Sequence, residues 1–218
     1  MPMPIRVFIA DDHGIVRDGL RSILQAQADI QVVGEADNGL DCLRRLPETH
    51  PEVVLMDIAM PGMNGIETAT QLRTLYPNLK ILFLSMHVAA GHVRRALQAG
   101  ACGYLVKESA GAEVVQAVRA AHAGRRFFSQ KIATLVVEEG LFSNSVSAAN
   151  PLELISNRER QVLQLVAEGK TSAEIGGLLS LSPKTVETYR SRLMEKLHLA
   201  DVPALVKFAI KQGLISVD

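Results

Sequence analysis

The sequence predicts a doubly wound α/β domain with a five-stranded parallel sheet, followed by a small all-α domain of four helices. Residues 1–122 alternate short β-branched runs with amphipathic helical stretches, which is the pattern of a parallel sheet covered by helices on both faces. Residues 139–152 are rich in small and polar residues, as is typical of an interdomain linker. From Ser156 onward the strand-like runs stop and helix-capping residues recur.

Each expected strand of the first domain is mostly apolar, as strands buried on both faces are. The five strands are expected at residues 5–10, 30–36, 53–56, 80–84 and 103–106. The segments between them place apolar residues three and four positions apart, which gives a helix one apolar face. Examples are Ile15, Gly19, Leu20, Ile23 and Leu24, and later Val114, Val115 and Val118. Because open parallel sheets bind ligands at the carboxyl ends of their strands, residues that directly follow a strand are the candidates for chemistry.

The second domain is expected to contain four short helices, at residues 158–168, 172–179, 183–197 and 203–212. Capping residues mark where helices begin, and these are Ser156 with Glu159, Thr171 with Glu174, and Ser182 followed by Pro183. Gly169 and Gly213 are expected to end helices, because glycine adopts the left-handed conformation common after a last turn.

The composition limits the class of protein. Lys and Arg together number 23, as do Asp and Glu, so the formal net charge is zero. The net charge therefore does not indicate any class of binding partner. Cys42 and Cys102 are too few for a disulfide framework and fit a reducing compartment. No apolar run reaches the roughly 18 residues of a membrane span, and the first residues are too polar for a signal peptide. A soluble, cytoplasmic protein is therefore expected.

Three carboxylates follow strands that are expected to lie near one another. Asp11 and Asp12 follow the first strand, and Asp57 follows the third. Neighbouring carboxylates repel one another, and a hard cation such as Mg²⁺ or a basic neighbour keeps them ionised. Ser85 after the fourth strand and Lys107 after the fifth add a hydroxyl and an ammonium group at the same edge. This set suits the transfer of a phosphoryl group to an aspartate.

Over residues 5–122 the chain resembles the receiver domain of two-component response regulators. The resemblance is carried by Asp11 and Asp12, by residues 56–65 (Met-Asp-Ile-Ala-Met-Pro-Gly-Met-Asn-Gly), by Ser85, and by residues 103–107 (Gly-Tyr-Leu-Val-Lys). It implies a flavodoxin-like fold in which Asp57 is the phosphoacceptor and Lys107 offsets charge on the transferred oxygens.

The same resemblance implies how the site binds a cation and responds to phosphorylation. Asp12, Asp57 and the backbone carbonyl of Ala59 are expected to bind Mg²⁺, with Asp11 acting mainly through water. Ser85 and Tyr104 are expected to form a switch pair. In that pair the hydroxyl turns toward the phosphoryl group, the ring moves inward behind it, and the face formed by the fourth helix, fifth strand and fifth helix changes.

One departure and two alternatives concern this site. Many receivers have proline after the lysine, whereas this chain has Glu108, so a trans peptide bond is expected there. An aspartate before a helix favours the helix N-terminus, so capping is an alternative role for Asp12. His13 beside the two aspartates suggests a transition-metal site as a further alternative, for which His87 is the only candidate second histidine.

Over residues 152–215 the chain resembles the LuxR-type helix-turn-helix domain found in the NarL/FixJ family of regulators. The matching segments are residues 157–163 (Asn-Arg-Glu-Arg-Gln-Val-Leu), 165–169 (Leu-Val-Ala-Glu-Gly), 174–175 (Glu-Ile) and 181–190 (Leu-Ser-Pro-Lys-Thr-Val-Glu-Thr-Tyr-Arg). Gly176, followed by Gly177, stands where alanine is usual. Because glycine costs a helix about 1 kcal/mol relative to alanine, a loose helix is expected there. Tyr189 stands where many members have histidine.

The helix expected at residues 183–197 is the candidate DNA-reading element. Val186, Leu193 and Leu197 share one stripe of its helical wheel, and polar residues face away. In helix-turn-helix proteins this second helix enters the major groove. The resemblance assigns base contacts to Glu187, Thr188 and Ser191. Residues suited to DNA phosphates are Lys184, Thr185, Arg190, Arg192 and Lys196. A solvated polar face without DNA contacts is the alternative for each of them.

The two resemblances divide the chain into a receiver domain (1–124), a connecting helix and linker (125–151) and a DNA-binding domain (152–218). The last expected helix has more apolar surface than one packing face needs, so it is a candidate for dimerisation. A homodimer would bind an inverted repeat of half-sites.

Together these features imply a transcription regulator that a sensor histidine kinase phosphorylates on Asp57, with dimerisation and sequence-specific DNA binding under the control of that step. RNA polymerase is a further candidate partner. A receiver that mediates protein contacts without phosphorylation is the alternative. A phosphohydrolase needs a second acid two residues after its nucleophile, where this chain has Ala59. Catalysis beyond the receiver's own phosphoryl transfer and dephosphorylation is therefore not expected.

Overall fold

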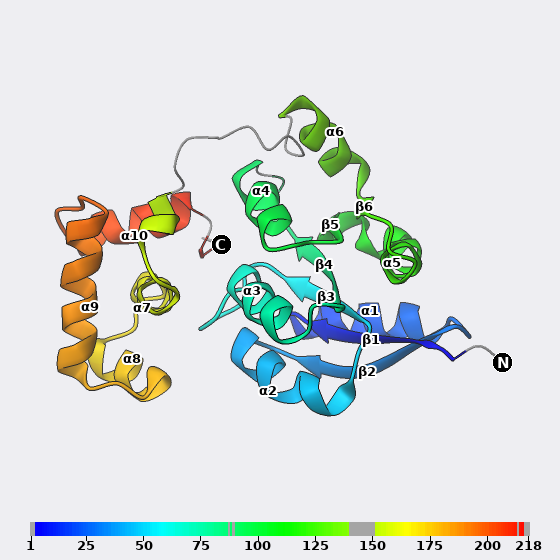
Figure 1. Ribbon diagram of the computed structural model, residues 1–218, viewed down its shortest axis with the longest axis horizontal. Helices are drawn as coiled ribbons and strands as arrows, with labels where there is room; N and C mark the ends of the chain where they lie inside the picture. The colour runs from blue at the N-terminus through cyan, green and yellow to red at the C-terminus, as the bar shows by residue number, and fades with distance from the viewer. Residues whose placement is uncertain (1–2, 87, 89, 140–150, 213, 216–218) are drawn as a thin grey trace. The chain divides into compact units, whose positions relative to one another are not determined.

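The chain folds into two compact units, Met1–Ser143 and Asn144–Asp218, seen in the computed structural model of Figure 1. The structure describes residues 3–86, 88, 90–139, 151–212 and 214–215. Each unit has a hydrophobic core of its own. The first unit is of the α/β class and the second is helical, which confirms the predicted fold class.

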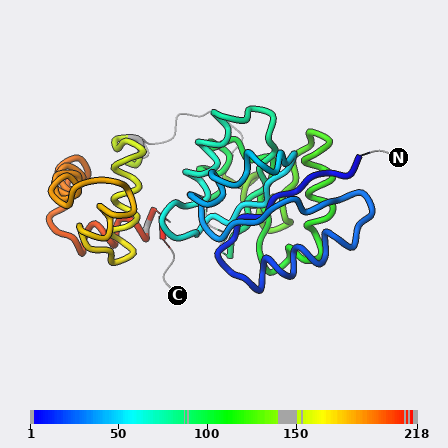
Figure 2. The backbone as a smooth tube through the Cα atoms, turned by 90° about the horizontal axis from the view of Figure 1, so that it is seen from below, coloured from blue at the N-terminus to red at the C-terminus, as the bar shows by residue number. Residues whose placement is uncertain are grey.

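A parallel sheet forms the centre of the first unit, with its strands in the order β2-β1-β3-β4-β5-β6 (Figure 1). Figure 2 shows the course of the backbone after a turn of 90°. The strands are β1 Ile5–Ala10, β2 Ile30–Ala36, β3 Val53–Asp57, β4 Lys80–Ser85, β5 Gly103–Val106 and β6 Phe127–Phe128. Asp57 lies opposite Leu84, and Ser85 lies opposite Val106. The carboxyl ends of β3, β4 and β5 therefore meet at one edge of the sheet.

Helices cover both faces of this sheet, as predicted. They are α1 Gly14–Gln25, α2 Gly39–Thr49, α3 Gly65–Leu75, α4 Ala90–Gln98, α5 Lys107–His122 and α6 Gln130–Glu138. Helices α2, α3, α4 and α6 contribute to the core on one face, and α1 and α5 to the core on the other. Alternate strand residues enter the two cores, as Met56 and Leu55 of β3 do. Of the helices that the structure describes, none combines the length and the apolar character that crossing a membrane requires.

The structure adds a strand, β6, to the five that the sequence predicts. Phe127 and Phe128 pair with Gly103 and Tyr104 of β5. Two apolar residues are too few to stand out as a strand-like run, so the sequence holds no strand signal there. A Cβ atom at Gly103 would lie 2.2 Å from the carbonyl oxygen of Phe127, so the close pairing of β5 and β6 depends on glycine.

The apolar face predicted for α1 includes one residue that the structure exposes. The side chains of Leu20 and Leu24 are buried in the core, but Ile15 is 89% exposed. At about 100° per residue, Ile15 lies off the stripe formed by Val16, Leu20 and Leu24, which explains why it does not pack. Its inclusion in the packing face was therefore wrong.

In the second unit, the described residues start with a short 3-10 helix, η1 Pro151–Leu154, and continue with α7 Asn157–Ala167, α8 Ser172–Leu179, α9 Pro183–Lys196 and α10 Val202–Lys211. Both predicted capping boxes are present, and the side chain of Ser182 accepts a hydrogen bond from the backbone of Thr185. Gly169 follows α7 in the left-handed conformation, with φ of 81°. Gly213 lies outside the described residues.

The turn between α8 and α9 explains one of the two adjacent glycines. The backbone N–H of Leu181 donates to the carbonyl oxygen of Gly176 at 2.9 Å. A Cβ atom at Gly176 would lie 2.6 Å from the carbonyl oxygen of Leu181, whereas one at Gly177 would meet nothing within 4 Å. Helix α8 is continuous across both glycines. Gly176 therefore permits a close turn, and the looseness expected of this helix stays a prediction.

Candidate functional site

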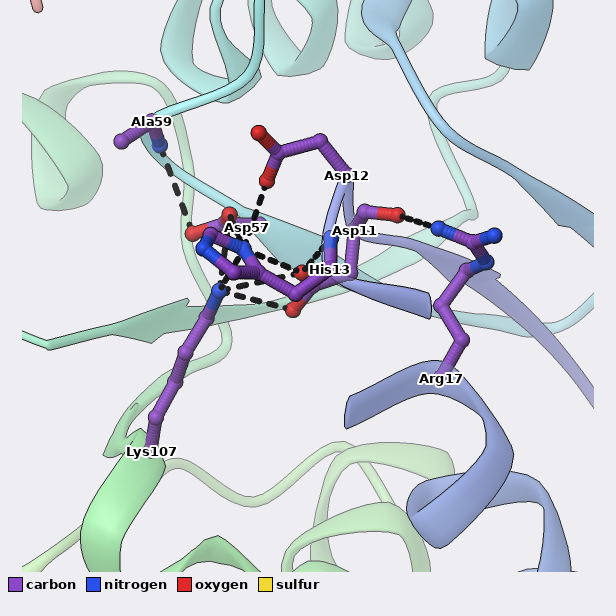
Figure 3. A network of polar contacts seen from close by, with 7 residues as sticks. All are labelled: Asp11, Asp12, His13, Arg17, Asp57, Ala59 and Lys107. Atoms are coloured by element: carbon purple, nitrogen blue, oxygen red, sulfur yellow. Dashed lines mark hydrogen bonds and ion pairs between the residues drawn. The ribbon is translucent and has the colours of Figure 1, made fainter. Parts of the chain in front are cut away.

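The carboxylate pocket, defined here as Asp11, Asp12, Asp57 and Lys107, lies where β1, β3 and β5 end (Figure 3). Asp11 directly follows β1, Asp57 is the last residue of β3, and Lys107 is the first residue of α5. The side chains of Asp11 and Asp57 are 0% and 2% exposed, and that of Asp12 is 30% exposed. The fold thus brings together the three carboxylates and the lysine that the sequence singles out.

Lys107 forms ion pairs with two of these carboxylates. Its Nζ lies 2.8 Å from Asp57 Oδ2 and 2.9 Å from Asp11 Oδ2. Burial by itself would lower the pKa of Lys107, but the charges and hydrogen bonds of Asp57 and Asp11 outweigh burial and raise it. The ammonium group therefore stays charged. No cis peptide bond occurs among the described residues, so the bond between Lys107 and Glu108 is trans, as predicted.

The environment of Asp57 favours its protonated form. Burial, and next the charge of Asp11, raise the pKa of Asp57 to about 6, and the charge of Lys107 opposes them without cancelling them. A nucleophilic aspartate must be ionised. A divalent cation in the pocket would lower this pKa, because it adds positive charge beside the carboxylate.

The pocket has the donor atoms that a divalent cation needs. One ligand atom from each of Asp11, Asp12, His13 and Asp57 can be chosen so that all four lie within 4.8 Å of one another. Among the described residues, the buried Asp11 Oδ2 accepts no well-aligned hydrogen bond, although Lys107 Nζ is close to it. Three carboxylates against one ammonium leave excess negative charge, and carboxylate oxygens are the ligands that Mg²⁺ prefers. The residues present therefore fit Mg²⁺.

The loop after β3 holds Asp57 through backbone contacts. The N–H of Ala59 donates to Asp57 Oδ1 at 3.3 Å, and the N–H of Gly65 donates to the carbonyl of Ile58 at 3.0 Å. A Cβ atom at Gly65 would lie 2.0 Å from the carbonyl oxygen of Asp57. Asn64 then caps α3 by accepting a hydrogen bond from the backbone of Glu67. The expected role of the Ala59 carbonyl as a metal ligand stays a prediction.

Arg17 contacts this site, although the sequence analysis does not assign it there. Its Nη1 donates to the carbonyl oxygen of Asp11 at 2.5 Å, and its Nε lies 3.8 Å from Glu35 Oε2. Figure 3 shows the guanidinium group on the side of the Asp11 backbone that is opposite to Lys107. The sequence does contain a signal for this contact. Arg17 lies one helical turn after His13, and residues four apart share a helix face, so Arg17 is placed on the side of α1 that faces the carboxylates.

His13 turns its ring toward the carboxylates. Its Nδ1 lies 2.8 Å from Asp12 Oδ1, 3.2 Å from Asp11 Oδ1 and 3.9 Å from Asp57 Oδ2. His87, the second histidine considered for a transition-metal site, lies outside the described residues.

The expected switch residues are buried beside the pocket. Ser85 is 4% exposed and Tyr104 is 1% exposed. Burial raises the pKa of Tyr104 to about 12, against the opposing effects of a hydrogen bond with Ser85 and the charge of Arg95. The ring thus already has the inward position that the resemblance expects it to reach on phosphorylation, and its hydroxyl is bonded to that of Ser85.

The outward face of α9 carries most of the predicted DNA contacts. Lys184, Glu187, Thr188, Ser191 and Arg192 are exposed, and Thr185 is half-buried. The hydroxyls of Thr188 and Ser191 donate to carbonyl oxygens one turn earlier in the same helix, at 3.0 and 3.1 Å. Val186 and Leu193, on the opposite face, are buried in the core. The helix therefore has one packed face and one polar face, as predicted.

Two basic residues of α9 are engaged within the unit. Lys196 Nζ lies 2.8 Å from both carboxylate oxygens of Glu159 in α7. Burial by itself would raise the pKa of Glu159, but hydrogen bonds from Lys196 and Ser156 hold it below its usual value. Arg190 Nη1 donates to the hydroxyl of Ser172 at 3.2 Å. The contact with Glu159 makes Lys196 a poorer candidate for DNA phosphates than Lys184.

Comparison with protein families matches both parts of the chain. Residues 7–119 match the family described as response regulator receiver domain. Residues 153–209 match the family described as bacterial regulatory proteins, luxR family.

Similar proteins cover nearly the whole chain. Response regulator GacA of Pseudomonas viridiflava is 38% identical over 97% of this chain and 98% of its own length. Transcriptional regulatory protein LiaR of Bacillus subtilis is 38% identical over 97% of this chain and all of its own length. Oxygen regulatory protein NreC of Staphylococcus epidermidis is 33% identical over 97% of this chain and 99% of its own length.

Solved structures give the same relationship. The RcsB response regulator of Salmonella typhimurium has a TM-score of 0.59 and 28% identity, covering 95% of this chain and 98% of that one. A structure of two RcsB dimers bound to two parallel DNAs has a TM-score of 0.59 and 27% identity, covering 94% of this chain and 97% of that one. The chain therefore belongs to the NarL/FixJ family of response regulators, in which a receiver domain is joined to a LuxR-type DNA-binding domain.

Proposed function

We propose that this protein is a cytoplasmic transcription regulator whose binding to DNA is controlled by phosphorylation of Asp57, with a sensor histidine kinase as the phosphoryl donor. The arrangement of Asp57 carries the proposal. This carboxylate is 2% exposed, lies 2.8 Å from the ammonium of Lys107, and has two further carboxylates beside it. A structural ion pair needs one carboxylate for one lysine, whereas a phosphoryl-transfer site needs spare negative charge to bind a cation.

The groups of the pocket have complementary roles in this transfer. An oxygen of Asp57 attacks the phosphorus of a phosphohistidine whose other ring nitrogen carries a proton, the phosphorus–nitrogen bond breaks, and the electron pair of that bond stays on the departing neutral imidazole. Asp11, Asp12, Asp57 and the carbonyl of Ala59 would hold Mg²⁺, which when bound offsets charge on the transferred oxygens. Lys107, which now donates to Asp57 Oδ2, is placed to donate to a phosphoryl oxygen.

Ser85 and Tyr104 would link phosphorylation of Asp57 to a change in the rest of the receiver. Their side chains are hydrogen-bonded to each other at the end of β4 and within β5. A hydroxyl can donate and accept at once, so Ser85 can donate to the phosphoryl group and still accept from the hydroxyl of Tyr104, which would hold the ring in its buried position. Strand β5 pairs with β6, which leads into α6, so the position of Tyr104 would act on these two elements.

The second unit would bind DNA through α9 in the major groove. The exposed polar residues Glu187, Thr188 and Ser191 are the candidates for base edges, and Lys184, Thr185, Arg190 and Arg192 for phosphates. The related RcsB structures contain dimers bound to DNA. For this chain, a homodimer on an inverted repeat is the corresponding proposal.

Phosphorylation with acetyl phosphate and Mg²⁺ tests the acceptor. The parent protein should gain one phosphoryl group, and Asp57→Asn should gain none, because the amide is not a nucleophile. Asp18→Asn is the matched control, since this aspartate on α1 is 69% exposed. Equal labelling of Asp57→Asn and the parent would exclude Asp57 as the acceptor.

Binding to fragmented genomic DNA, measured with and without acetyl phosphate, tests the control step. Phosphorylation should strengthen binding to specific fragments for the parent and for Asp18→Asn only. If the treatment labels Asp57 but leaves DNA binding unchanged, the receiver acts by protein contacts alone and the proposed control is wrong.

A further inference from the structure

The polar face of α9 carries an acidic residue, Glu187, that the described part of the chain leaves unpaired. Its side chain is exposed, and its carboxylate forms no ion pair or hydrogen bond among the described residues. Glu159 and Glu174, by contrast, each complete a capping box. A carboxylate on a face that meets DNA is repelled by the phosphates. Glu187 therefore weakens DNA binding unless it gains a contact that offsets this repulsion.

The two hydroxyls beside Glu187 have their protons engaged within the helix. Thr188 Oγ1 donates to the carbonyl oxygen of Lys184 at 3.0 Å, and Ser191 Oγ donates to the carbonyl oxygen of Glu187 at 3.1 Å. A hydroxyl has one proton, so each of these oxygens offers only acceptor lone pairs to a further partner. An ionised carboxylate likewise only accepts. The three candidates for base contacts therefore present acceptors and no donors.

The bases of DNA differ in how their major-groove edges meet such a face. Donors there are the N4 amino group of cytosine and the N6 amino group of adenine, whereas guanine presents two acceptors and thymine an acceptor and a methyl group. In adenine the acceptor N7 lies beside the amino group and repels a carboxylate, but cytosine has no acceptor beside its N4. We propose that Glu187 selects cytosine by accepting a hydrogen bond from its N4 amino group. The hydroxyls of Thr188 and Ser191 offer no donor that would hold guanine or thymine there instead.

A solvated acid that only weakens binding to all DNA is the competing account of Glu187. Glu195 provides the comparison, because it is an exposed acid in the last turn of the same helix. Recognition helices contact base edges with their N-terminal residues, so Glu187 is placed to read a base and Glu195 is not. The charge of either acid opposes DNA binding, but only that of Glu187 should affect which sequence is bound. The inference rests on the proposed binding of DNA by α9.

Selection of binding sites from random DNA duplexes tests this inference with the full-length protein, with and without acetyl phosphate. The parent, Glu187→Gln and the matched control Glu195→Gln are compared. Both substitutions remove one negative charge, and glutamine keeps the shape of glutamate while adding an amide donor. Sequencing of the bound duplexes gives the preference for each base at each position. The affinity for the best duplex is then measured with its preferred C·G pair and with T·A in that place.

The parent should prefer cytosine at one position of each half-site, and its affinity should fall about tenfold or more when T·A replaces that pair. Glu187→Gln should change its preference at this position alone, toward adenine, because glutamine can bind N6 and N7 together. Glu195→Gln should keep every preference of the parent.

Two results would overturn the inference and leave DNA binding by α9 standing. In one, the parent selects a sequence and Glu187→Gln selects the same one. In the other, Glu195→Gln changes the preference at the same position as Glu187→Gln does. If the parent selects no sequence with or without acetyl phosphate, the proposed function fails and the inference fails with it.

Discussion

At Asp57 the fold stabilises the protonated form of a residue whose proposed role needs the ionised form. The pKa of this carboxyl is raised to about 6, first by burial and then by the charge of Asp11. A carboxyl with a raised pKa stabilises the fold fully below its unfolded pKa near 4, and that contribution is lost as the pH rises through 6. The metal-free pocket is therefore a source of instability at neutral pH.

Asp57→Asn should show this instability directly, because the amide has the shape of the carboxyl group without its charge. With EDTA present, the variant should be more stable than the parent by about 2–3 kcal/mol at pH 7.5, and the difference should shrink toward pH 4. Chemical unfolding of both proteins between pH 4 and 7.5 measures it. A difference that does not change with pH would mean that Asp57 has an ordinary pKa.

The adjacent glycines of α8 give a second prediction for single residues. Gly177→Ala should raise the free energy of unfolding by about 0.5–1 kcal/mol, because alanine favours helix and its Cβ meets nothing within 4 Å. Gly176→Ala should lower it by about 1 kcal/mol or more, since its Cβ would lie 2.6 Å from the carbonyl oxygen of Leu181. Thermal unfolding of the two variants should show opposite signs. Equal stabilisation by both would show that the turn relaxes freely.

Among elements, β6 and α6 lie where the receiver leads into the rest of the chain. Ile132 and Val136 of α6 are buried in the same core as Tyr104. Glu113 of α5 accepts hydrogen bonds from the hydroxyls of Ser109 and Ser129, and the N–H of Ser129 donates to the carbonyl of Tyr104 at 3.0 Å. The start of α6 is therefore bonded to both β5 and α5. A change at Tyr104 has a direct route to this helix.

On α9, two lysines that look alike in the sequence should behave differently. Lys184 is exposed in the first turn, whereas Lys196 in the last turn binds the buried carboxylate of Glu159. Lys184→Ala should weaken binding to all DNA and reduce the slope of log affinity against log salt by about 1.

Lys196→Ala should leave that slope unchanged and lower the free energy of unfolding by about 0.5–1 kcal/mol, because Glu159 loses a charged partner that is itself partly exposed to solvent. Salt titrations of DNA binding and unfolding curves for both variants separate the two roles. A reduced slope for Lys196→Ala would show that Lys196 contacts a DNA phosphate and would contradict this prediction.

At the scale of the whole molecule, each of the two units has its own core. Leu55 is buried in the receiver core and Leu193 in the core of the second unit, both with 0% exposure. Units with separate cores are expected to unfold separately.

Leu193→Ala should therefore destabilise the second unit by about 2–5 kcal/mol and leave the first unit unchanged, and Leu55→Ala should do the reverse. Hydrogen exchange of peptides from each unit of the full-length protein measures both effects. If either substitution raises exchange in both units, they unfold as one.

Local patterns in the sequence were sufficient for the fold class, for five of the strands, for the capping residues, and for the set Asp11, Asp57 and Lys107. Apolar strand runs, helix spacing and residues at strand ends are properties of short segments, so they can be read without coordinates. These patterns wrongly placed Ile15 in the packing face of α1. Spacing alone shows that apolar residues share a helix face, but it does not show which direction that face points relative to the core.

Only the tertiary structure showed which groups far apart in the sequence are partners. It paired Lys196 with Glu159 and directed the ring of His13 into the carboxylate pocket. Such contacts depend on how separate elements pack and on the side-chain rotamer that packing selects, and neither leaves a periodic signal in the sequence. The pairing of β6 with β5 is likewise visible only in the tertiary structure, because a strand of two residues is recognised by its hydrogen bonds to the neighbouring strand.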